Sequence, residues 1–476
     1  MDSYLVRSVG TNRGALRLYL DGSILARSSF TPGMPYDIES SKDSRSLLLR
    51  RVQSGARVVS RKRKPGRSEF MPVIDINSDA LLSVFGGGSI VRVVISVDSI
   101  SITLIASELA RLERLDRLNR SIQSRHLKIG SVAHGIGGMA YSAHAGLLRT
   151  GLGSELVAAV ELDGNWLGHA IEKNPVWSTS TVAVAAPLQE FVQDPISRDF
   201  KVDVLELGIP CSGASRAGKA KRGLTRMEAH PEVGHLVVPA LMLIHAWSPA
   251  VIVVENVKSY SNEASADLLR SMLADMGYQV QEACLVATDF GELERRERWF
   301  LVAVTRGIQF DITSVLSDDR SRYRNVRYVA DVLDPIEDDG PEWSSFDYLD
   351  TKAVRDAEKG SNFANQTVDA SDIEVPTLRK GYQKVGSTDP LLAHPTKVGL
   401  KRRFTVAEHA RLKGQPEFLV EGLGVVAGHA ALGQSVAFEP VARLFEEIGN
   451  ALLKWGESDP QTAFHVPRYS LVSATG

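Results

Sequence analysis

The hydrophobic pattern of the first hundred residues differs from that of the rest of the chain. Short alternating or β-branched runs, such as LRLYL, RSLLLRRV, MPVIDI and IVRVVISV, are separated by turn signals such as Asp21-Gly22. Alternation with a period of two is typical of strands, so this pattern predicts a β-rich N-terminal domain over residues 1–105. Four leucines then recur at helical spacing, which predicts a linking helix over 106–125.

From residue 126 onward, strand patterns and helix patterns alternate. A strand at 127–134 leads into a glycine turn, a helix of small residues follows, and the next strand, LVAAVELD, ends in acids. Two prolines divide the longest apolar window, 236–254, which therefore predicts a buried helix, a turn and a central strand rather than a membrane span. Strands that alternate with helices predict an α/β fold with a doubly wound sheet.

The alternation stops between residues 307 and 398, where periodic runs are few and where basic, aromatic and glycine residues interleave. This segment is typical of an inserted recognition domain rather than of a core. The remaining segments are then an α/β domain over 126–306, its completing part over 399–456, and a loose tail over 457–476.

Composition and charge narrow the class of protein. The 476 residues are 43% hydrophobic and 24% charged with a net charge of −2, as in a globular protein of about two or three domains. Residues 50–67 carry eight cations and no acid, a pattern that permits contact with nucleic-acid phosphates but equally fits a charged, solvated edge strand. Two cysteines are too few for a disulfide framework or a zinc site, and charged residues interrupt any N-terminal signal peptide. We therefore expect a cytoplasmic protein without a metal.

A candidate nucleophile follows the strand VDVLELGIP. Cys211 comes directly after Pro210, and the ends of strands are where open α/β sheets hold their reactive groups. The next segment, 216–226, contains five Arg and Lys residues and no acid, as a phosphate-binding loop would. The pattern favours a reactive thiol beside this loop, although an inert buried cysteine is the more common case.

Charged side chains also follow or begin two other apolar strands. Glu255 ends the strand VIVVEN, where it either caps the next helix or is an acid whose pKa is raised by burial. Arg296 and Arg298 alternate at the start of another strand, so they would point the same way and could bind an anion or a carbonyl oxygen. A solvated edge is the simpler alternative for the two arginines.

The glycine turn is the third candidate site. Residues 135–138 follow one strand, and Glu161 ends the next, an arrangement in which backbone amides approach a ligand and the acid binds ribose hydroxyls. Glycines in a tight turn can also serve conformation alone. The lysine and serine of a triphosphate-binding loop are absent from this turn, so the pattern indicates a nucleoside-containing cofactor of another kind.

These segments together resemble the cytosine-5 DNA methyltransferases over residues 126–452. Five motifs occur in the family's order: HGIGG at 134–138, PCSGAS at 210–215, ENV at 255–257, ERRER at 294–298, and RRFTVAEHARLKGQP at 402–416 followed by GQSV at 433–436. The motifs are weak one by one, but their ordered occurrence is specific to this family. The resemblance implies a Rossmann-like methyltransferase sheet with an inserted target-recognition domain.

The resemblance also implies a reaction, in which a methyl group passes from S-adenosylmethionine to carbon 5 of a flipped-out cytosine in a specific sequence of double-stranded DNA. Cys211, as thiolate, would add to carbon 6 of the cytosine. Glu255 would bind the ring nitrogen at position 3 as a proton donor. Arg298 would hold the carbonyl oxygen, and Arg296 a neighbouring group or a phosphate.

Binding residues follow from the same motifs. The implied cofactor-binding residues are Gly135, Ile136, Gly137, Gly138, Glu161, Leu162, Pro210, Gln434, Ser435 and Val436. The implied DNA-binding residues are Ser215, Arg216, Lys219, Lys221, Arg222, Thr377, Leu378, Arg379 and Lys380.

The chain departs from the family pattern mainly around the adenine site. Ala133 and Leu162 stand where aromatic residues are usual, and the sequence near 185–188 has no aspartate. Ser212 and Glu294 replace the usual glutamines. The catalytic set is complete, whereas these departures predict a weakened pocket for the adenine of the cofactor.

Three alternative functions share part of this pattern. A transfer-RNA cytosine-5 methyltransferase would have the same catalytic residues, and a DNA-binding relative without catalysis would have no need to keep all four of them. A nicotinamide-dependent dehydrogenase shares only the glycine turn and the acid. For the DNA enzyme we expect association with the nucleoid through DNA, no membrane partner, and a possible companion restriction endonuclease.

Overall fold

The structure is a computed structural model that describes residues 3–63, 70–86, 90–210, 213, 223, 225–316, 326–358 and 366–458. Contacts divide the chain into two compact units, one up to Asp116 and one over Arg117–Glu457. The boundary falls within helix α2 (Ala106–Gln123). Each unit is described by itself.

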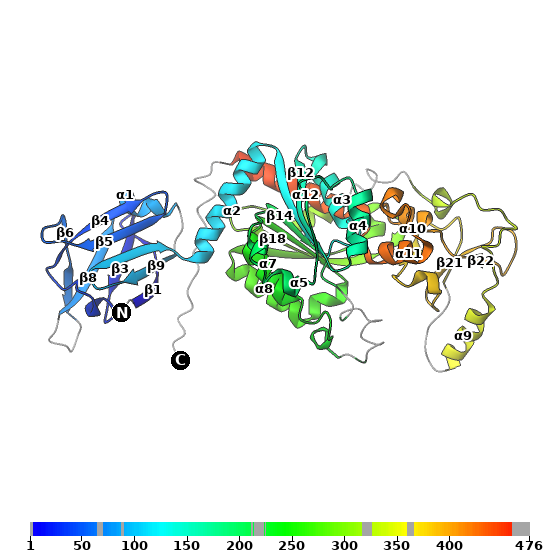
Figure 1. Ribbon diagram of the computed structural model, residues 1–476, viewed down its shortest axis with the longest axis horizontal. Helices are drawn as coiled ribbons and strands as arrows, with labels where there is room; N and C mark the ends of the chain where they lie inside the picture. Colours follow the sequence, from blue (N-terminus) through cyan, green and yellow to red (C-terminus); the bar gives the residue numbers. More distant parts are fainter. Residues whose placement is uncertain are drawn as a thin grey trace. The chain divides into compact units, whose positions relative to one another are not determined.

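The first unit is built from two antiparallel sheets (Figure 1). The six-stranded sheet has the order β1 (Ser3–Ser8), β9 (Ile90–Ile95), β10 (Ser99–Leu104), β5 (Ser46–Arg51), β4 (Pro35–Ser41) and β6 (Arg57–Val58). The four-stranded sheet has the order β2 (Gly10–Asn12), β3 (Ala15–Asp21), β8 (Phe70–Asn77) and β7 (Ser60–Arg63). One hydrophobic core contains Leu47 and Ile100 of the first sheet and Leu18 and Ile74 of the second, so the two sheets share their apolar faces.

Acids within this unit neutralise several cations of the basic stretch at 50–67. Arg50 lies 3.2 Å from Glu39, Arg51 lies 3.5 Å from Asp98, and Lys62 pairs with Asp21. These pairs weaken the local positive field that would attract phosphates. Arg50 and Arg51 lie in β5 inside the six-stranded sheet, whereas Lys62 lies in the edge strand β7, and a DNA contact by this stretch stays a prediction.

The second unit contains a seven-stranded sheet that confirms the predicted α/β class. Its order is β13 (Val182–Ala185), β12 (Gly153–Glu161), β11 (His126–Val132), β14 (Val204–Leu207), β15 (Val251–Asn256), β18 (Glu297–Thr305) and β16 (Tyr278–Val286). The first five strands are parallel, whereas β18 is antiparallel to both of its neighbours. The strand order reverses direction beside β11, which is where sheets of this class bind ligands.

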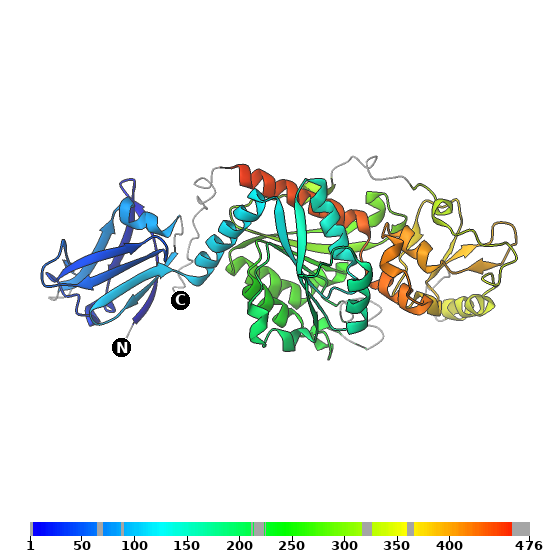
Figure 2. The same ribbon diagram turned by 45° about the horizontal axis from the view of Figure 1, so that its top comes forward.

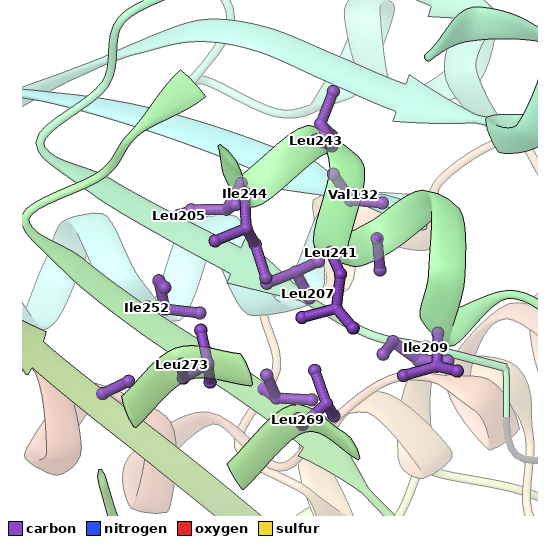
Figure 3. Packing of buried hydrophobic residues seen from close by; sticks show 14 of the residues in the cluster. Val132, Leu205, Leu207, Ile209, Leu241, Leu243, Ile244, Ile252, Leu269 and Leu273 are labelled. Carbon is purple, nitrogen blue, oxygen red and sulfur yellow. The ribbon is translucent and has the colours of Figure 1, made fainter. Parts of the chain in front are cut away.

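Helices cover both faces of this sheet (Figures 1 and 2). One face carries α5 (Leu188–Phe191), α7 (Val237–Trp247) and α8 (Ala264–Asp275), and the other carries α3 (Gly138–Arg149) and α12 (Phe438–Glu457). Helix α4 (Gly164–Lys173) follows β12. Figure 3 shows Leu205, Leu207 and Ile252 of the sheet packed against Ile244 and Leu273 of the helices, all fully buried. None of the helices in the described residues is long and apolar enough to cross a membrane.

The segment between β18 and the C-terminal helices forms a smaller lobe. It contains α9 (Asp347–Glu358), β19 (Gln366–Val368), β20 (Val375–Pro376), β21 (Pro390–Ala393) and β22 (Lys401–Arg402). Strand β20 pairs with β17 (Glu294–Arg295), and the lobe shares a hydrophobic core with Leu293 and Leu412. The chain returns through α10 (Val406–Leu412) and α11 (Val425–Gln434) to α12. The lobe is therefore attached directly to the residues that precede Arg296.

Candidate active site

The predicted site residues of the sheet lie at one edge, because the parallel strands β11, β12, β14 and β15 all end there. Hydrogen bonds hold these ends together: the Gly208 amide donates to Val132 O at 3.0 Å, and the His134 amide to Val160 O at 3.2 Å. The proposed nucleophile, Cys211, lies outside the described residues. So do the predicted DNA contacts Ser215, Arg216, Lys219, Lys221 and Arg222.

Asn256 holds the turn that leads into Cys211. Its buried side-chain amide donates to Ile209 O at 3.0 Å, and its carbonyl oxygen accepts from the Val257 amide at 2.8 Å. Both polar groups of the side chain thus form hydrogen bonds with backbone groups, one after β14 and one after β15. These bonds hold the Ile209-Pro210 segment next to the end of β15, where Glu255 lies. Sequence analysis identified the ENV motif but not this role of its asparagine.

Glu255 and Arg298 form an ion pair on adjacent strands. Their Oε1 and Nε atoms are 2.9 Å apart, and 12% and 17% of the two side chains remain exposed. Burial raises the pKa of the Glu255 carboxyl, whereas the charges of Arg298 and Arg296 lower it. The net shift is upward, so the carboxyl binds a proton more readily than a free carboxyl and can serve as an acid.

Arg296 has different surroundings from Arg298. It is buried, its Nη2 donates to Gly433 O at 3.0 Å, and its Nη1 lies 3.5 Å from Glu294 Oε1. The two guanidiniums differ in burial, but the charges of both lower the pKa of the Glu255 carboxyl, so the expectation that they point the same way stays a prediction. A phosphate cannot reach this guanidinium without a rearrangement.

The predicted cofactor residues come together around the glycine turn. Gly135 and Gly137 have φ values of +57° and +77°, a conformation that side chains disfavour. The Gly135 amide donates to Glu161 Oε2 at 2.7 Å, which joins the ends of β11 and β12. A Cβ atom on Gly138 would lie 2.2 Å from Ser435 Oγ, so the GQSV segment packs directly on the turn.

Two other residues lock this arrangement. The buried Gln415 amide nitrogen lies 3.2 Å from both Ser142 Oγ and Val436 O. The Asn174 amide donates to Gly137 O at 2.9 Å and contacts Ile136 O at 3.2 Å. Hydrogen bonds between buried groups therefore join the glycine turn and the C-terminal segment into one continuous surface.

The residues of this surface fit S-adenosylmethionine. Among the described residues other than its two chain neighbours, no atom lies within 4 Å of the position of a Cβ on Gly135, so the backbone beside the Glu161 carboxylate is open to a ligand. Leu162 follows with 69% of its surface exposed, an apolar side chain available to a flat ring. A carboxylate for hydroxyl groups and an apolar neighbour for adenine are what a nucleoside requires.

A buried histidine, His134, supports the turn; sequence analysis included it in the HGIGG motif but gave it no role. His134 Nδ1 lies 2.8 Å from Ser131 Oγ, and Trp177 Nε1 donates to His134 Nε2 at 3.2 Å. Burial lowers the pKa of His134 to about 3, so the ring is neutral at physiological pH. Because Nε2 accepts from the indole, Nδ1 carries the proton and donates to Ser131.

Glu206 is an acid inside the central strand β14. It is 2% exposed, pairs in register with Ser131 and Val253, and its Oε2 has no hydrogen-bond partner among the described residues. Burial raises its pKa from 4.5 to about 8, whereas a hydrogen bond to Ser131 lowers it. The carboxyl is therefore neutral at pH 7. Its signal in the sequence was a lone acid within the apolar run VLEL.

We expect Glu206 to make the second unit less stable as pH rises. Between pH 4.5 and about 8 the carboxyl of Glu206 stays protonated in the folded state but loses its proton in the unfolded state. The free energy of unfolding therefore falls as the pH rises through this window, and the full stability is present only below pH 4.5. Glu206→Gln should remove up to about 1.4 kcal/mol per pH unit of this slope. Urea unfolding between pH 5 and pH 8 measures it, with the exposed Glu190→Gln as control. Equal slopes in the wild type and Glu206→Gln would contradict the assignment.

The predicted DNA-binding segment of the smaller lobe is held by other parts of the second unit. Thr377 Oγ1 donates to Arg295 O at 2.6 Å, Arg379 lies 2.8 Å from Asp389, and Lys380 Nζ donates to Gln434 Oε1 at 2.9 Å. Leu378 is fully buried in the core of the lobe. Its side chain therefore anchors the segment and cannot itself contact DNA in this arrangement.

Comparisons with known proteins agree with this architecture. A family model described as C-5 cytosine-specific DNA methylase matches residues 127–450. The type II methyltransferase M.MspI from a Moraxella species is 26% identical over 270 residues, which cover 56% of this chain and 60% of that relative. The human tRNA (cytosine(38)-C(5))-methyltransferase is 27% identical over 181 residues, which cover 37% of this chain and 42% of that relative.

A solved structure, the Dnmt2 methyltransferase of S. pombe, has the same fold, with a TM-score of 0.53 and 18% identity over 69% of this chain and 98% of that one. The family match spans most of the second unit, including the glycine turn, the Glu255–Arg298 pair and the segment at 433–436. On this evidence the chain belongs to the C-5 cytosine-specific DNA methylase family.

Proposed function

We propose that the protein is a DNA (cytosine-5-)-methyltransferase that methylates cytosine in a specific double-stranded sequence. The observation that carries this proposal is the Glu255–Arg298 pair, which joins β15 to β18. Strand β15 ends beside the segment that precedes Cys211, at the same end of the sheet as the glycine turn and Glu161. The Glu255 carboxyl, the residues that lead to position 211 and the glycine turn lie at or just after the ends of neighbouring parallel strands, and this arrangement supports the proposal.

Each protein group has a distinct task in the proposed reaction. The Cys211 thiolate adds to carbon 6 of a flipped-out cytosine, which makes carbon 5 electron-rich. Glu255 gives its proton to the ring nitrogen at position 3 and so neutralises the charge that develops there. Arg298 orients Glu255 through their 2.9 Å contact and offers its remaining donors to the cytosine carbonyl oxygen. Once carbon 5 carries the methyl group, loss of its proton to a base restores the ring double bond and expels Cys211, and the ring nitrogen returns its proton to Glu255.

The methyl donor of this family is S-adenosylmethionine, which supplies an electrophilic methyl group when bound. In this chain Glu161 would hold the ribose hydroxyls, Leu162 would contact the adenine, and Gly135 to Gly138 with Ser435 and Val436 would surround the rest. The absence of an aromatic residue at Ala133 and Leu162 leaves the adenine contact smaller, so we expect modest affinity rather than a lost site.

Transfer RNA is the second candidate substrate, because a human tRNA methyltransferase is among the relatives. The smaller lobe beside the active site and the type II relatives favour DNA. A companion endonuclease would fit a type II relative, and association with the nucleoid would follow from DNA binding.

Sequencing of both nucleic acids tests the proposal. DNA and transfer RNA from cells that express this chain would be sequenced with chemistry that distinguishes 5-methylcytosine, next to cells with the empty vector. We expect new methylation at one short DNA motif and none on transfer RNA. Methylation of transfer RNA alone would establish the second candidate, and well-expressed protein that leaves no mark would contradict both and support the catalytically lost relative.

A further inference from the structure

Three buried charged side chains form a cluster at the junction of the sheet, the smaller lobe and the C-terminal helices. Glu294 lies 3.2 Å from Lys413 Nζ and 3.5 Å from Arg296 Nη1, and none of the three side chains is more than 1% exposed. Although burial opposes ionisation, Lys413 and Arg296 lower the pKa of Glu294. The carboxylate is therefore charged and lies between the Arg296 guanidinium and Lys413, whose own pKa is lowered by burial to about 7 although Glu294 raises it.

One side of the cluster binds the segment Thr377–Lys380, which we call the recognition segment. Glu294 Oε1 accepts from the Leu378 amide at 2.9 Å. The neighbouring Thr377 hydroxyl donates to Arg295 O, and β17 pairs with β20 just before the segment. The backbone of the recognition segment thus has a fixed position relative to Glu294.

The other side of the cluster binds residues 432–436, which are the end of helix α11 and the two residues after it and which we call the cofactor loop. Lys413 Nζ donates to Leu432 O, and Arg296 Nη2 donates to Gly433 O at 3.0 Å. These two carbonyls immediately precede the residues that pack on the glycine turn. The same cluster therefore holds both segments.

The two segments also touch each other. A Cβ atom on Gly433 would lie 2.3 Å from the Lys380 backbone nitrogen, so the backbones are in direct contact. Lys380 Nζ adds a hydrogen bond to Gln434 Oε1 at 2.9 Å. A displacement of one segment consequently requires a displacement of the other or the separation of buried charges.

We propose that the Glu294–Arg296–Lys413 cluster is a positioning unit that couples the recognition segment to the cofactor loop, so that a ligand in the cofactor site also orders the recognition segment. The inference rests on the proposed function for the identity of the cofactor site. By linkage the coupling is reciprocal, so a target bound at the recognition segment strengthens cofactor binding by the same factor. The three charges act through backbone groups and touch no reacting atom.

Hydrogen exchange of the full chain tests the coupling without knowledge of the DNA target. Exchange would be measured by mass spectrometry for peptides over 430–437 and 375–382, with and without S-adenosylhomocysteine. We expect the ligand to slow exchange in both peptides, by about fivefold or more in the second. Slowing confined to 430–437 would overturn the coupling and leave the proposed function intact. No slowing at 430–437 or at the glycine turn would instead contradict the proposed cofactor site.

Variants identify the route of the coupling. The double change Glu294→Gln and Lys413→Met removes one charge of each sign and leaves Arg296 with its bond to Gly433 O. It should keep the slowing at 430–437 but leave at 375–382 only the part that the Lys380–Gln434 contact transmits. The matched control is Arg270→Met with Glu282→Gln, which neutralises an ion pair of 2.6 Å between α8 and β16 and should behave as the wild type. Transmission as strong in the cluster variant as in the wild type would overturn the role of the cluster.

A surface variant gives a second readout that does not disturb the buried charges. Lys380→Met removes only the exposed bond to Gln434 and should weaken the transmitted slowing about twofold to threefold, a loss of the size expected for one hydrogen bond. Lys380→Arg should restore it. The control Lys384→Met changes an exposed lysine of the same lobe and should have no effect. Equal transmission in Lys380→Met and in the wild type would remove this contact from the proposal.

Discussion

Cys211→Ser is expected to reduce methyl transfer below detection while target-DNA binding stays within about twofold of the wild type. The serine hydroxyl has nearly the size of the thiol, but it does not ionise near pH 7, whereas a cysteine with a pKa of about 8.5 supplies a thiolate fraction that the bound substrate can increase. The measurement is the rate of tritium-labelled methyl incorporation into DNA that carries the methylated motif, together with a gel-shift titration of the same duplex.

The matched control for this variant is Cys284→Ser. Cys284 lies opposite Trp299 in the edge strand pair β16 and β18, and burial raises the pKa of its thiol. That thiol is therefore a poor nucleophile, and its replacement should leave the methylation rate within about twofold. Full activity of Cys211→Ser would contradict the covalent mechanism. Loss of activity in Cys284→Ser alone would show that Cys284, and not Cys211, is the nucleophile.

Glu255→Gln is expected to slow the chemical step by about 10²-fold to 10⁴-fold, the usual contribution of a positioned general acid. The amide keeps the shape of the side chain and can donate a hydrogen bond to the ring nitrogen, but it has no proton to transfer. Because burial raises the pKa of the carboxyl, the wild-type residue holds a proton at a pH where a free carboxyl does not. Single-turnover methylation under saturating DNA and S-adenosylmethionine isolates this step.

The control is Glu297→Gln, which makes the same change next to Arg298. Glu297 pairs with Lys258 at 2.8 Å on the surface, an exposed ion pair of the kind that contributes little. Its rate should stay within about twofold of the wild type. A loss of similar size in both variants would mean that the rate depends on the negative charge near Arg298 or on the stability of the fold, and not on a proton from Glu255. An unchanged rate in Glu255→Gln would exclude Glu255 as the acid.

The sequence by itself determined the local elements and the identity of the chemical groups. The period-two runs of the first hundred residues are strands, the window 236–254 is the buried helix α7 followed by the central strand β15, and the apolar stripe after GQSV is α12. These outcomes depend on periodicity within about ten to twenty residues, which the chain order preserves. The sequence could also predict that the motif residues at the strand ends lie together, because the carboxyl ends of parallel strands lie at one side of the sheet.

Only the tertiary structure decided what surrounds those groups. Glu294 meets Leu378, Lys413 and Arg296, and Arg296 reaches Gly433, so residues more than a hundred positions apart share one buried cluster. The local pattern put Arg296 and Arg298 at the start of one strand, and the family resemblance implied a DNA contact at Leu378. The structure shows that the side chains of Arg296 and Leu378 are buried. Whether a charge faces a ligand or a buried counter-charge depends on desolvation and on partners brought by other segments, and neither quantity is encoded in the residue's own neighbourhood along the chain.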